Sequence, residues 1–235
     1  DVLRNTYEPG SVIPYGPGWN HTLGWDLGSR DDMALVIWGW HPDYEDLYEV
    51  MSWKKPGAGS DEVMGVIDDF ERRLKLSIIA YAADTGGGGK MYVDEVHRRF
   101  TRRFTAAQKT QKYNHARLFG DDLRTGHIKL LRDSPYALEI AALLRDPDWS
   151  ADDLEGDPNP PTEDPRCANH CCDAGLYSWR EAYHFYRPAK EAPPPVRGTK
   201  EFIDAQVEQM MLNRHKTSFD KLDEEGIYGF GAEDY

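Results

Sequence analysis

Three aspartates stand at positions where elements of a protein core are expected to end or begin. Asp26 lies in His-Thr-Leu-Gly-Trp-Asp-Leu-Gly (21–28), Asp84 in Ile-Ile-Ala-Tyr-Ala-Ala-Asp-Thr (78–85) and Asp173 in Asn-His-Cys-Cys-Asp-Ala-Gly (169–175). Each aspartate ends an apolar run or starts an amphipathic one, so we expect all three to face a shared cleft. Carboxylates brought together repel one another and raise one another's pKa unless cations hold them. The pattern therefore predicts a metal site.

The ligand types indicate which metal and which reaction this site would use. Carboxylate oxygens are the ligands that magnesium and manganese prefer, whereas thiolates and clustered histidines suit other metals. Two such ions, about 4 Å apart, make a water nucleophilic and neutralise the charge that develops on a leaving oxygen. We therefore predict two-metal hydrolysis of phosphodiesters, with Asp26, Asp84 and Asp173 as catalytic metal ligands and two Mg²⁺ or Mn²⁺ ions as cofactors.

Two further side chains could complete this site. Asp32 follows Asp26 by six positions and either returns toward the metals or serves as a turn residue in the first hairpin. His170 lies three residues before Asp173, so a helix would place both on one face. It could orient a water or the scissile phosphate, or act as a structural histidine that donates to a backbone carbonyl. We interpret Asp32 as a metal ligand and His170 as a catalytic residue.

The distribution of charge bears on the substrate. A formal net charge of -13 argues, taken alone, against nucleic acid, because phosphates are bound chiefly by Lys and Arg. Residues 97–117, however, contain seven Lys and Arg side chains and no Asp or Glu. Such a block can be only a solvated face. Its place between the second and third aspartates favours contact with DNA, a role we assign to Arg102, Arg103, Lys109 and Lys112.

The first half of the chain predicts elements that would bring two of the aspartates together. Short strands over residues 22–26, 33–40 and 46–53, joined by turn-forming links, form an antiparallel meander. A helix capped by Ser60 follows, and then a buried strand over 76–83 that ends at Asp84. A right-handed crossover makes this strand parallel to a neighbour in the sheet. If that neighbour is the first strand, Asp26 and Asp84 become adjacent.

The rest of the chain continues the alternation. We expect helices over 90–100, 110–123, 135–144 and 169–186, and strands at 103–107 and 127–131, with an irregular loop over 146–165. The predicted fold class is α/β, a mixed sheet of the ribonuclease-H type flanked by helices. The predicted organisation is a linker leading into the domain (1–20), a nuclease domain (21–188), and a linker, short helix and acidic tail (189–235).

Several other classes of protein are disfavoured. The chain lacks an apolar run of about 18 residues and a secretory start, so we expect an intracellular protein with no membrane partner. It begins at Asp1 in a loop-like segment, which suggests a piece of a longer protein. Cys167, Cys171 and Cys172 are an odd number, typical of a reducing compartment. Zinc bound by Cys167, His170 and Cys171 is an alternative to simple buried thiols, although a fourth ligand is missing.

The glycine run after Asp84 could be mistaken for a phosphate-binding loop. A Walker A motif needs Gly, four residues, and then Gly-Lys followed by Ser or Thr. Here the first position is Asp84, and Met91 follows Lys90. The glycines instead predict a tight turn beside the aspartate, which lets the backbone approach closely.

Together, these segments resemble the C-terminal nuclease domain of the large terminase subunit of tailed bacteriophages. The resemblance covers about residues 22–186. It is carried by the segments Gly-Trp-Asp-Leu-Gly (24–28), Ala-Asp-Thr-Gly-Gly-Gly-Gly-Lys (83–90), Ala-Gln-Lys-Thr-Gln-Lys (107–112), Leu-Arg-Thr-Gly-His-Ile-Lys (123–129) and His-Cys-Cys-Asp-Ala-Gly-Leu-Tyr (170–177). One departure is Asn169, where the family commonly has an aspartate. A second is that no motif of the family's packaging ATPase is present.

The resemblance implies a ribonuclease-H-like fold and an endonuclease that cuts double-stranded concatemeric viral DNA when packaging starts and ends. It implies Asp26, Asp84 and Asp173 as ligands of magnesium or manganese, with Asp32 and His170 as auxiliary residues. The implied partners are DNA, an N-terminal packaging ATPase domain of the same full-length chain, the portal protein and the small terminase subunit. The implied location is the cytoplasm of the host cell. The acidic tail would dock on the portal or another packaging component.

Two alternatives remain from the residues themselves. A junction-resolving nuclease of the same superfamily would share the acidic cluster but prefer branched DNA. An actin-like or sugar-kinase-like nucleotide-binding domain also begins with Asp-Leu-Gly in a meander, although that class usually needs two such halves and a longer chain.

Overall fold

A mixed sheet of seven strands organises the computed structural model, which describes residues 5–28, 32–86, 88–100, 102–143, 168–186 and 203. The chain divides into two units, residues 1–188 and 189–235, and every described residue except Ile203 belongs to the first. The strand order is β1-β7-β4-β3-β2-β5-β6. The predicted loop over 146–165, linker and tail lie outside the described residues.

The antiparallel meander forms the centre of the sheet. It consists of β2 (Asn20–Leu27), β3 (Asp32–Trp40) and β4 (Leu47–Pro56). Asp26 pairs with Ala34 of β3, and Ala34 pairs with Lys54 of β4. Most side chains of β2 and β3 are buried, because helices cover both faces of the sheet. The predicted meander is confirmed, with each strand one to three residues longer than expected at an end.

A crossover helix then extends the sheet with a parallel strand. Helix α2 (Ser60–Leu74) leads to β5 (Ile78–Ala83), which pairs with β2 in parallel. Gly59, and not Ser60, is the N-cap residue, and its position has no side-chain capping bond, so the predicted cap is wrong. The helix ends at Lys75, which adopts a left-handed conformation with φ 51. The expected placement of β5 beside β2 is confirmed.

The helices and strands predicted between residues 90 and 186 are present, whereas the short helix predicted within 189–235 lies largely outside the described residues. They are α3 (Gly89–Phe100), β6 (Thr105–Ala106), α4 (Lys112–Thr125), β7 (Ile128–Leu131), α5 (Pro135–Leu143) and α6 (His170–Tyr186). Strand β6 pairs with β5, and β7 pairs with β4, both in parallel. Strand β1 (Thr6–Tyr7) pairs with β7. Part of the segment expected to be a linker therefore belongs to the sheet, where Tyr7 is buried.

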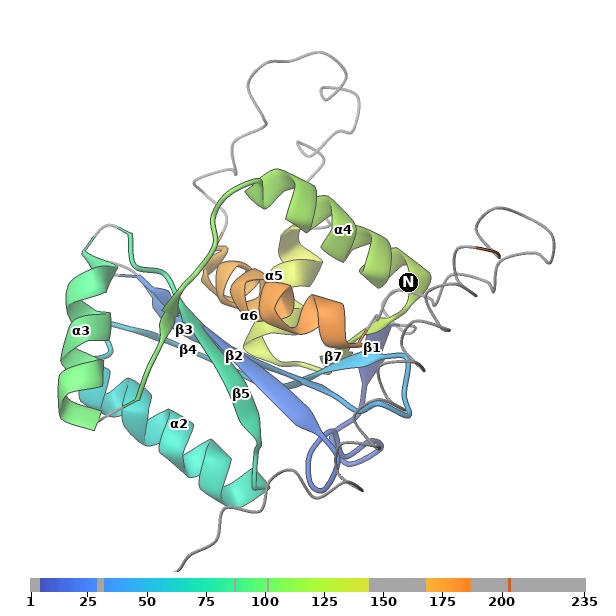
Figure 1. The fold of residues 1–235 in the computed structure, drawn as a ribbon, viewed down its shortest axis with the longest axis horizontal. Helices are drawn as coiled ribbons and strands as arrows, with labels where there is room; N and C mark the ends of the chain where they lie inside the picture. The colour runs from blue at the N-terminus through green and yellow to red at the C-terminus, as the bar shows by residue number, and fades with distance from the viewer. Residues whose placement is uncertain are drawn as a thin grey trace, which may run out of the picture. The chain divides into compact units, whose positions relative to one another are not determined.

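The sheet separates two groups of helices (Figure 1). Helices α2 and α3 cover one face, where Leu23, Trp25 and Leu27 of β2 join a core cluster with Val63 and Ile67 of α2. Helices α4, α5 and α6 cover the other face, where a second cluster combines β3 with these helices and includes Val36, Trp38, Phe119, Tyr136, Ala174 and Trp179. Because alternate residues of a strand point to opposite faces, Asp26 points to the face covered by α6.

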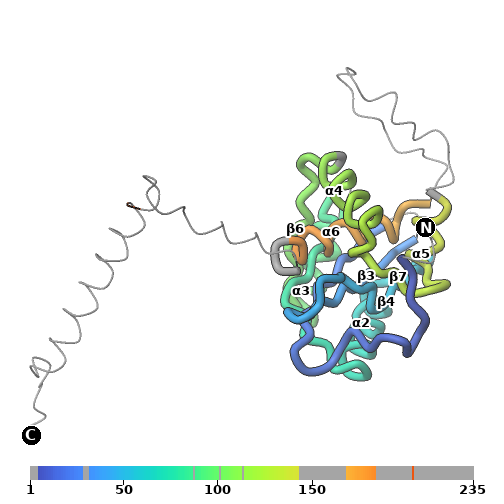
Figure 2. The backbone as a smooth tube through the Cα atoms, turned by 90° about the vertical axis from the view of Figure 1, so that its right-hand side faces the viewer, coloured from blue at the N-terminus to red at the C-terminus, as the bar shows by residue number. Residues whose placement is uncertain are grey.

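Helix α6 crosses the centre of the sheet, where the tube view also places it against the strands (Figure 2). A side chain at Gly24 of β2 would place its Cβ 1.8 Å from the carbonyl oxygen of Ala174. The Thr22 hydroxyl donates to the carbonyl of Ser178 at 2.9 Å, and the Trp38 indole donates to the carbonyl of Gly175 at 2.8 Å. Glycine at position 24 therefore allows the helix to lie directly on the strand. None of the described helices is long and apolar enough to cross a membrane.

Candidate active site

The sheet register places Asp26 and Asp84 side by side. Trp25 of β2 pairs with Ala83 of β5, and the amide of Asp84 donates to the carbonyl of Trp25 at 3.0 Å. Neighbouring strands lie about 4.8 Å apart, so the two aspartates that follow this pair are immediate neighbours. The adjacency expected from the crossover is present in the structure.

Helix α6 brings the third aspartate and the histidine to the same end of β2. Nδ1 of His170 lies 2.8 Å from Oδ2 of Asp26. His170 begins α6, and Asp173 follows one turn later on the same side of the helix. Asp26, Asp84 and His170 therefore lie together at the carboxyl ends of β2 and β5, and Asp173 lies one helical turn beyond His170.

Each of the three carboxylates faces a basic side chain. Nζ of Lys109 lies 2.6 Å from Oδ2 of Asp84, and Nζ of Lys112 lies 2.6 Å from Oδ1 of Asp173. His170 takes the same place beside Asp26. The two lysines predicted to bind DNA are thus within the carboxylate cluster. Only Lys112 lies on α4, because Lys109 precedes the helix.

The segment between β6 and α4 is held in place over the cluster. The amide of Ala107 donates to the carbonyl of Ala83 at 2.8 Å, which ties the segment to the end of β5. The guanidinium of Arg180 on α6 donates to the carbonyl of Gln108. Gln111 adopts a left-handed conformation with φ 55 just before α4 begins. These contacts direct the side chains of Lys109 and Lys112 to different aspartates.

The electrostatics of Asp26 reflect this surrounding. Its side chain is largely buried, and burial raises the pKa of its carboxyl above the ordinary value. The hydrogen bond from His170 and the charge of Lys109 oppose this rise, whereas the nearby Asp84 adds to it. The two carboxylates are therefore close enough to repel each other.

The turn after β5 also shapes the cluster. The amide of Gly86 donates to Oδ1 of Asp84 at 2.7 Å. A Cβ on Gly86 would lie 3.1 Å from that oxygen and 3.2 Å from Nζ of Lys109. A Cβ on Gly89 would lie 2.1 Å from the Asp84 carbonyl oxygen. At these two described positions, glycine lets the backbone pass close to the aspartate, as the sequence predicts.

The donor set fits a hard divalent cation in its chemistry. Three carboxylates, one of them hydrogen-bonded to a histidine, are oxygen ligands of the kind that magnesium and manganese take. Within the described part of the chain, however, no group of three or more His, Cys, Asp or Glu side chains is placed so that it could hold a metal ion. The lysine ammonium groups at 2.6 Å supply the positive charge that three gathered carboxylates require.

Arg102 lies apart from this group, and Asp32 pairs with Lys54 of β4. Asp32 begins β3 on the same face of the sheet as Asp26, and its Oδ2 lies 3.7 Å from Nζ of Lys54. Arg102 contacts Glu71 and Asp68 of α2 and the hydroxyl of Tyr81, on the face of the sheet covered by α2 and α3. Its guanidinium is therefore engaged away from Asp26, Asp84 and Asp173. Arg103 is exposed.

The thiols of α6 carry no sign of a metal site among the described residues. Cys171 is fully buried in the core cluster beneath α6, and Cys172 is half-buried; both are free thiols. Burial raises the pKa of both thiols well above the ordinary value, which disfavours thiolate ligands. Cys167, the other zinc ligand considered, lies outside the described residues.

Sequence reasoning missed Glu139 and Lys54. Glu139 on α5 is buried, and one of its oxygens accepts the amides of Cys171 and Cys172 at the start of α6. Its other oxygen accepts from Nζ of Lys54 at 2.7 Å. A signal was present, because Glu139 is the single charged residue in the apolar segment Pro-Tyr-Ala-Leu-Glu-Ile-Ala-Ala-Leu (135–143).

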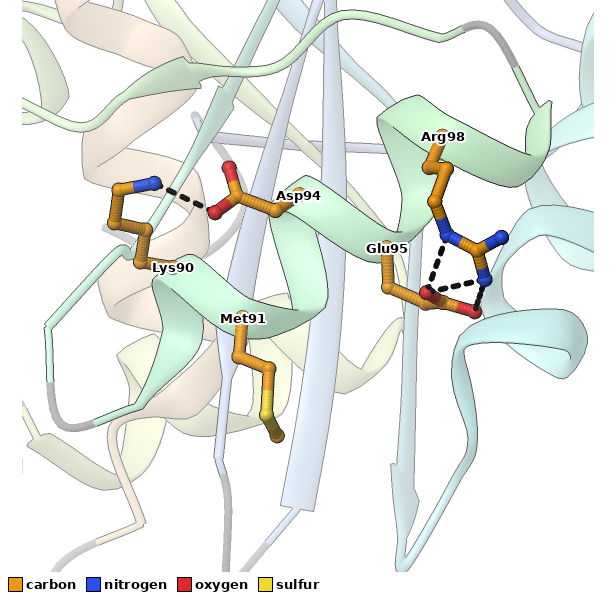
Figure 3. A pocket seen from close by; sticks show the side chains of 5 residues that line it. All are labelled: Lys90, Met91, Asp94, Glu95 and Arg98. Atoms are coloured by element: carbon orange, nitrogen blue, oxygen red, sulfur yellow. Dashed lines mark hydrogen bonds and ion pairs between the residues drawn. The ribbon is translucent and has the colours of Figure 1, made fainter.

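The surface of α3 has a shallow hollow that does not include Asp26, Asp84 or Asp173 (Figure 3). Its lining residues are Lys90, Met91, Asp94, Glu95 and Arg98. Lys90 pairs with Asp94 at 2.6 Å, and Arg98 pairs with Glu95 at 2.9 Å. Because its charges neutralise one another along a single helix, we assign no role to this hollow.

Comparison with known proteins gives a consistent fold. No family model matches the chain, and no curated protein matches its sequence. Among solved structures, the large terminase of a thermophilic bacteriophage is similar with a TM-score of 0.56 and 16% identity, covering 75% of this chain and 42% of that chain. The nuclease domain of the P22 large terminase gives 0.54 and 13%, covering 77% and 90%. The manganese-bound nuclease domain of the bacteriophage SPP1 large terminase gives 0.50 and 18%, covering 75% and 96%.

The fold is therefore that of the ribonuclease-H-like nuclease domains of large terminases, as the resemblance predicts. At these identities the likeness is one of fold. The chain spans 42% of the length of the first of these terminases, and 90% of the P22 nuclease domain.

Proposed function

We propose that the chain is a divalent-metal-dependent endonuclease that cuts double-stranded viral DNA at the start and end of genome packaging. One observation carries the proposal: Asp26 and Asp84 are neighbours at the carboxyl ends of β2 and β5, Asp173 lies on the turn of α6 that brings His170 to Asp26, and each aspartate lies beside a basic side chain. This arrangement occurs in a fold shared with terminase nuclease domains. A fold alone does not specify a function, and the proposal therefore rests on the carboxylates.

The aspartates would hold Mg²⁺ or Mn²⁺ with Asp26, Asp84 and Asp173 as ligands and Asp32 as an auxiliary one. Such ions, when bound as a pair, supply an activated water and neutralise the charge that develops on the leaving oxygen. The terminase nucleases of SPP1 and of the thermophilic phage G20c have been solved with bound Mn and bound zinc, respectively. His170 orients the Asp26 carboxylate by its hydrogen bond.

Lys109 and Lys112 explain how an acidic site could accept DNA, which is itself an anion. In the structure, Lys109 and Lys112 neutralise Asp84 and Asp173. If metal ions take over that role, both ammonium groups become available for the DNA backbone, where cations supply most of the affinity. We propose that Lys109, Lys112 and the exposed Arg103 contact DNA, whereas Arg102 stays within its contacts to α2.

The biological setting follows from the same likeness. The large terminase of the thermophilic bacteriophage is longer than this chain, which covers 42% of its length. That terminase has been solved in complex with ATP-γ-S. We propose that this domain works in the host cytoplasm with an N-terminal packaging ATPase domain of the same full-length chain, together with the portal protein and the small terminase subunit. The acidic C-terminal segment is the part we assign to docking.

Plasmid cleavage tests the proposal. The wild-type chain is incubated with Mg²⁺, Mn²⁺ or a chelator beside Asp26→Ala, Asp84→Ala and Asp173→Ala, with Asp121→Ala as the control. Asp121 is an aspartate on α4 that pairs with Arg124 at 2.6 Å. We expect metal-dependent cutting by the wild type and the control, and background cutting by the three site variants. Cutting that survives the chelator, or all three substitutions, would refute the proposal.

A second substrate separates the proposal from a junction-resolving nuclease. Linear duplexes and four-way junctions of the same sequence are digested side by side under the same conditions. We expect comparable cleavage of both substrates, because the proposed substrate is continuous duplex DNA. Strong preference for the junction would favour the resolving enzyme.

A further inference from the structure

Glu139 is a buried carboxylate in a segment of the sequence that is otherwise apolar, so a charge is not expected at this position. It lies on α5, where every other residue is uncharged, and it is 5% exposed. Burying an ionised carboxylate is costly unless hydrogen bonds and an opposite charge compensate it. The contacts that compensate Glu139 come from the first turn of α6 and from Lys54 of β4.

The first contact is with the beginning of α6. Oε2 of Glu139 accepts the amide of Cys171 at 2.8 Å and the amide of Cys172 at 3.1 Å. The first amides of a helix have no partner within the helix, and a carboxylate placed there is favoured by the helix dipole. Glu139 of α5 is thus the hydrogen-bond acceptor for two amides in the first turn of α6.

The position of these two amides matters for the site. Cys171 and Cys172 lie between His170, which contacts Asp26, and Asp173, which contacts Lys112. One turn of helix carries all four residues. Fixing the two central amides therefore fixes how this turn is rotated about the helix axis and where it lies along that axis. The same turn carries both His170 and Asp173.

The second contact links this turn to the sheet. Nζ of Lys54 lies 2.7 Å from Oε1 of Glu139 and 3.7 Å from Oδ2 of Asp32. Lys54 pairs in the sheet with Ala34, which in turn pairs with Asp26. One ammonium group therefore joins the carboxylate that caps α6 to Asp32 at the start of β3.

We infer that Glu139 is a positioning residue. Its carboxylate fixes the first turn of α6, and this keeps His170 and Asp173 in position relative to Asp26. Lys54, which contacts both Glu139 and Asp32, connects this turn to the start of β3. The inference rests on the proposed nuclease function for its kinetic consequence. Its structural consequence depends on the contacts alone.

The structural consequence is tested by hydrogen exchange of the amides of residues 170–174 in metal-free protein. Glu139→Met removes both acceptor oxygens at similar size, whereas Glu139→Gln keeps one. We expect exchange to be fastest in Glu139→Met and intermediate in Glu139→Gln. The double variant Glu139→Met with Lys54→Met serves if the single change prevents folding, because it leaves no unpaired buried charge.

The matched control is Glu62→Met. Glu62 pairs with Lys55 at 2.5 Å, as Glu139 pairs with Lys54, but it lies half-exposed on α2, away from the first turn of α6. We expect exchange in 170–174 to match the wild type. Equal protection of this turn in Glu139→Met and wild type would overturn the inference, whatever the enzyme does.

The kinetic consequence is tested with manganese and plasmid DNA. Loss of a residue that orients metal ligands typically lowers activity or metal affinity about 10- to 100-fold. We expect that loss in kcat for Glu139→Met, partial recovery in Glu139→Gln, and an unchanged KM for DNA. A wild type that does not cut refutes the nuclease proposal but leaves the exchange test standing. A wild type that cuts and a Glu139→Met variant with unchanged kcat refute the inference.

Discussion

Asp26 and His170, which are 144 positions apart in the chain, meet through an Oδ2–Nδ1 contact of 2.8 Å. The contact joins the end of β2 to the first residue of α6, at the point where Asp84 also arrives. It links the residue at the centre of the carboxylate group to the helix that carries Asp173. The geometry of the whole group therefore depends on where α6 lies on the sheet.

His170→Ala is expected to lower the rate of manganese-dependent cleavage about 10- to 100-fold, because Asp26 loses the group that orients its carboxylate. The measurement is the initial rate of plasmid nicking at saturating DNA. His115→Ala is the control, since His115 on α4 is only partly buried and, among the hydrogen bonds described, its Nδ1 contacts only the carbonyl of Gln111, the N-cap residue of the same helix. Equal rates for His170→Ala and wild type would contradict the assigned role.

Gly24→Ala is expected to destabilise the protein, because the new methyl group would lie 1.8 Å from the Ala174 carbonyl oxygen and push α6 away from β2. Overpacking of this kind costs about 1–3 kcal/mol. Urea unfolding measures the change in the free energy of unfolding. Gly65→Ala is the control: its Cβ would meet nothing within 4 Å on α2, and replacing a helical glycine stabilises by roughly 0.5–1 kcal/mol. A Gly24→Ala variant as stable as wild type would mean that α6 does not lie this close.

Arg102 and Arg103 are neighbours that we expect to behave oppositely. Arg102 donates to Glu71, Asp68 and the Tyr81 hydroxyl, so Arg102→Gln should lower the free energy of unfolding by about 1–3 kcal/mol. It should leave unchanged the salt dependence of DNA affinity, measured with chelator present. Arg103→Gln should leave stability unchanged and reduce the slope of log affinity against log salt by about 1. If Arg102→Gln reduced the salt dependence and Arg103→Gln reduced the stability, Arg102 and not Arg103 would be the residue that contacts DNA.

Glu49 gives the stability of the fold a dependence on pH. It is fully buried on β4, accepts the Leu131 amide at 3.0 Å, and has a pKa that burial raises from 4.5 to about 7. As pH rises from about 4.5 to about 7, the unfolded chain releases this proton while the folded chain keeps it. The folded state therefore loses stability over that window, and the loss is complete above the folded pKa.

Glu49→Gln removes this contribution. We expect the free energy of unfolding of Glu49→Gln, relative to that of the wild type, to increase between pH 5 and pH 8 by an amount on the order of a few kcal/mol. Urea unfolding at four pH values measures the difference. Glu62→Gln, a substitution of a half-exposed glutamate, should run parallel to the wild type. Parallel profiles for Glu49→Gln as well would show that Glu49 does not hold its proton.

The placement of Asp26 and Asp84 was predictable because it follows from local patterns and one chirality rule. Apolar alternation predicts the strands, and the right-handed crossover through α2 puts β5 beside β2. His170 and Asp173 share a helix, so their common face was also predictable. These relationships need only the periodicity of each element and the order of elements along the chain.

The partners of the charged side chains were not predictable in this way. Lys109 reaches Asp84, and Glu139 reaches Cys171, across 25 and 32 positions of the chain. A run of basic residues does not reveal that Arg102 turns to α2 while Lys109 turns to the aspartates. Strand β1 was missed because two residues carry no detectable alternation.

Lys109 is expected to compete with metal ions for Asp84, since its Nζ lies 2.6 Å from Oδ2. Manganese at 100 times its dissociation constant should stabilise the wild type by about 2.7 kcal/mol, and Asp84→Ala should lose that stabilisation. Lys109→Met should bind manganese roughly 3- to 5-fold more tightly, because a half-exposed ion pair contributes up to about 1 kcal/mol that metal no longer has to displace. Isothermal titration and thermal unfolding measure the two quantities.

Lys90→Met provides the matched control for this last substitution. Lys90 lies six residues beyond Asp84 and also pairs with an aspartate at 2.6 Å, but that partner, Asp94, belongs to the surface of α3. Removing it changes the net charge by the same amount as Lys109→Met. If both variants tighten manganese binding equally, the gain reflects net charge alone. If only Lys109→Met does so while its DNA affinity falls, the lysine acts both as a stand-in for the cation and as a ligand for the DNA backbone.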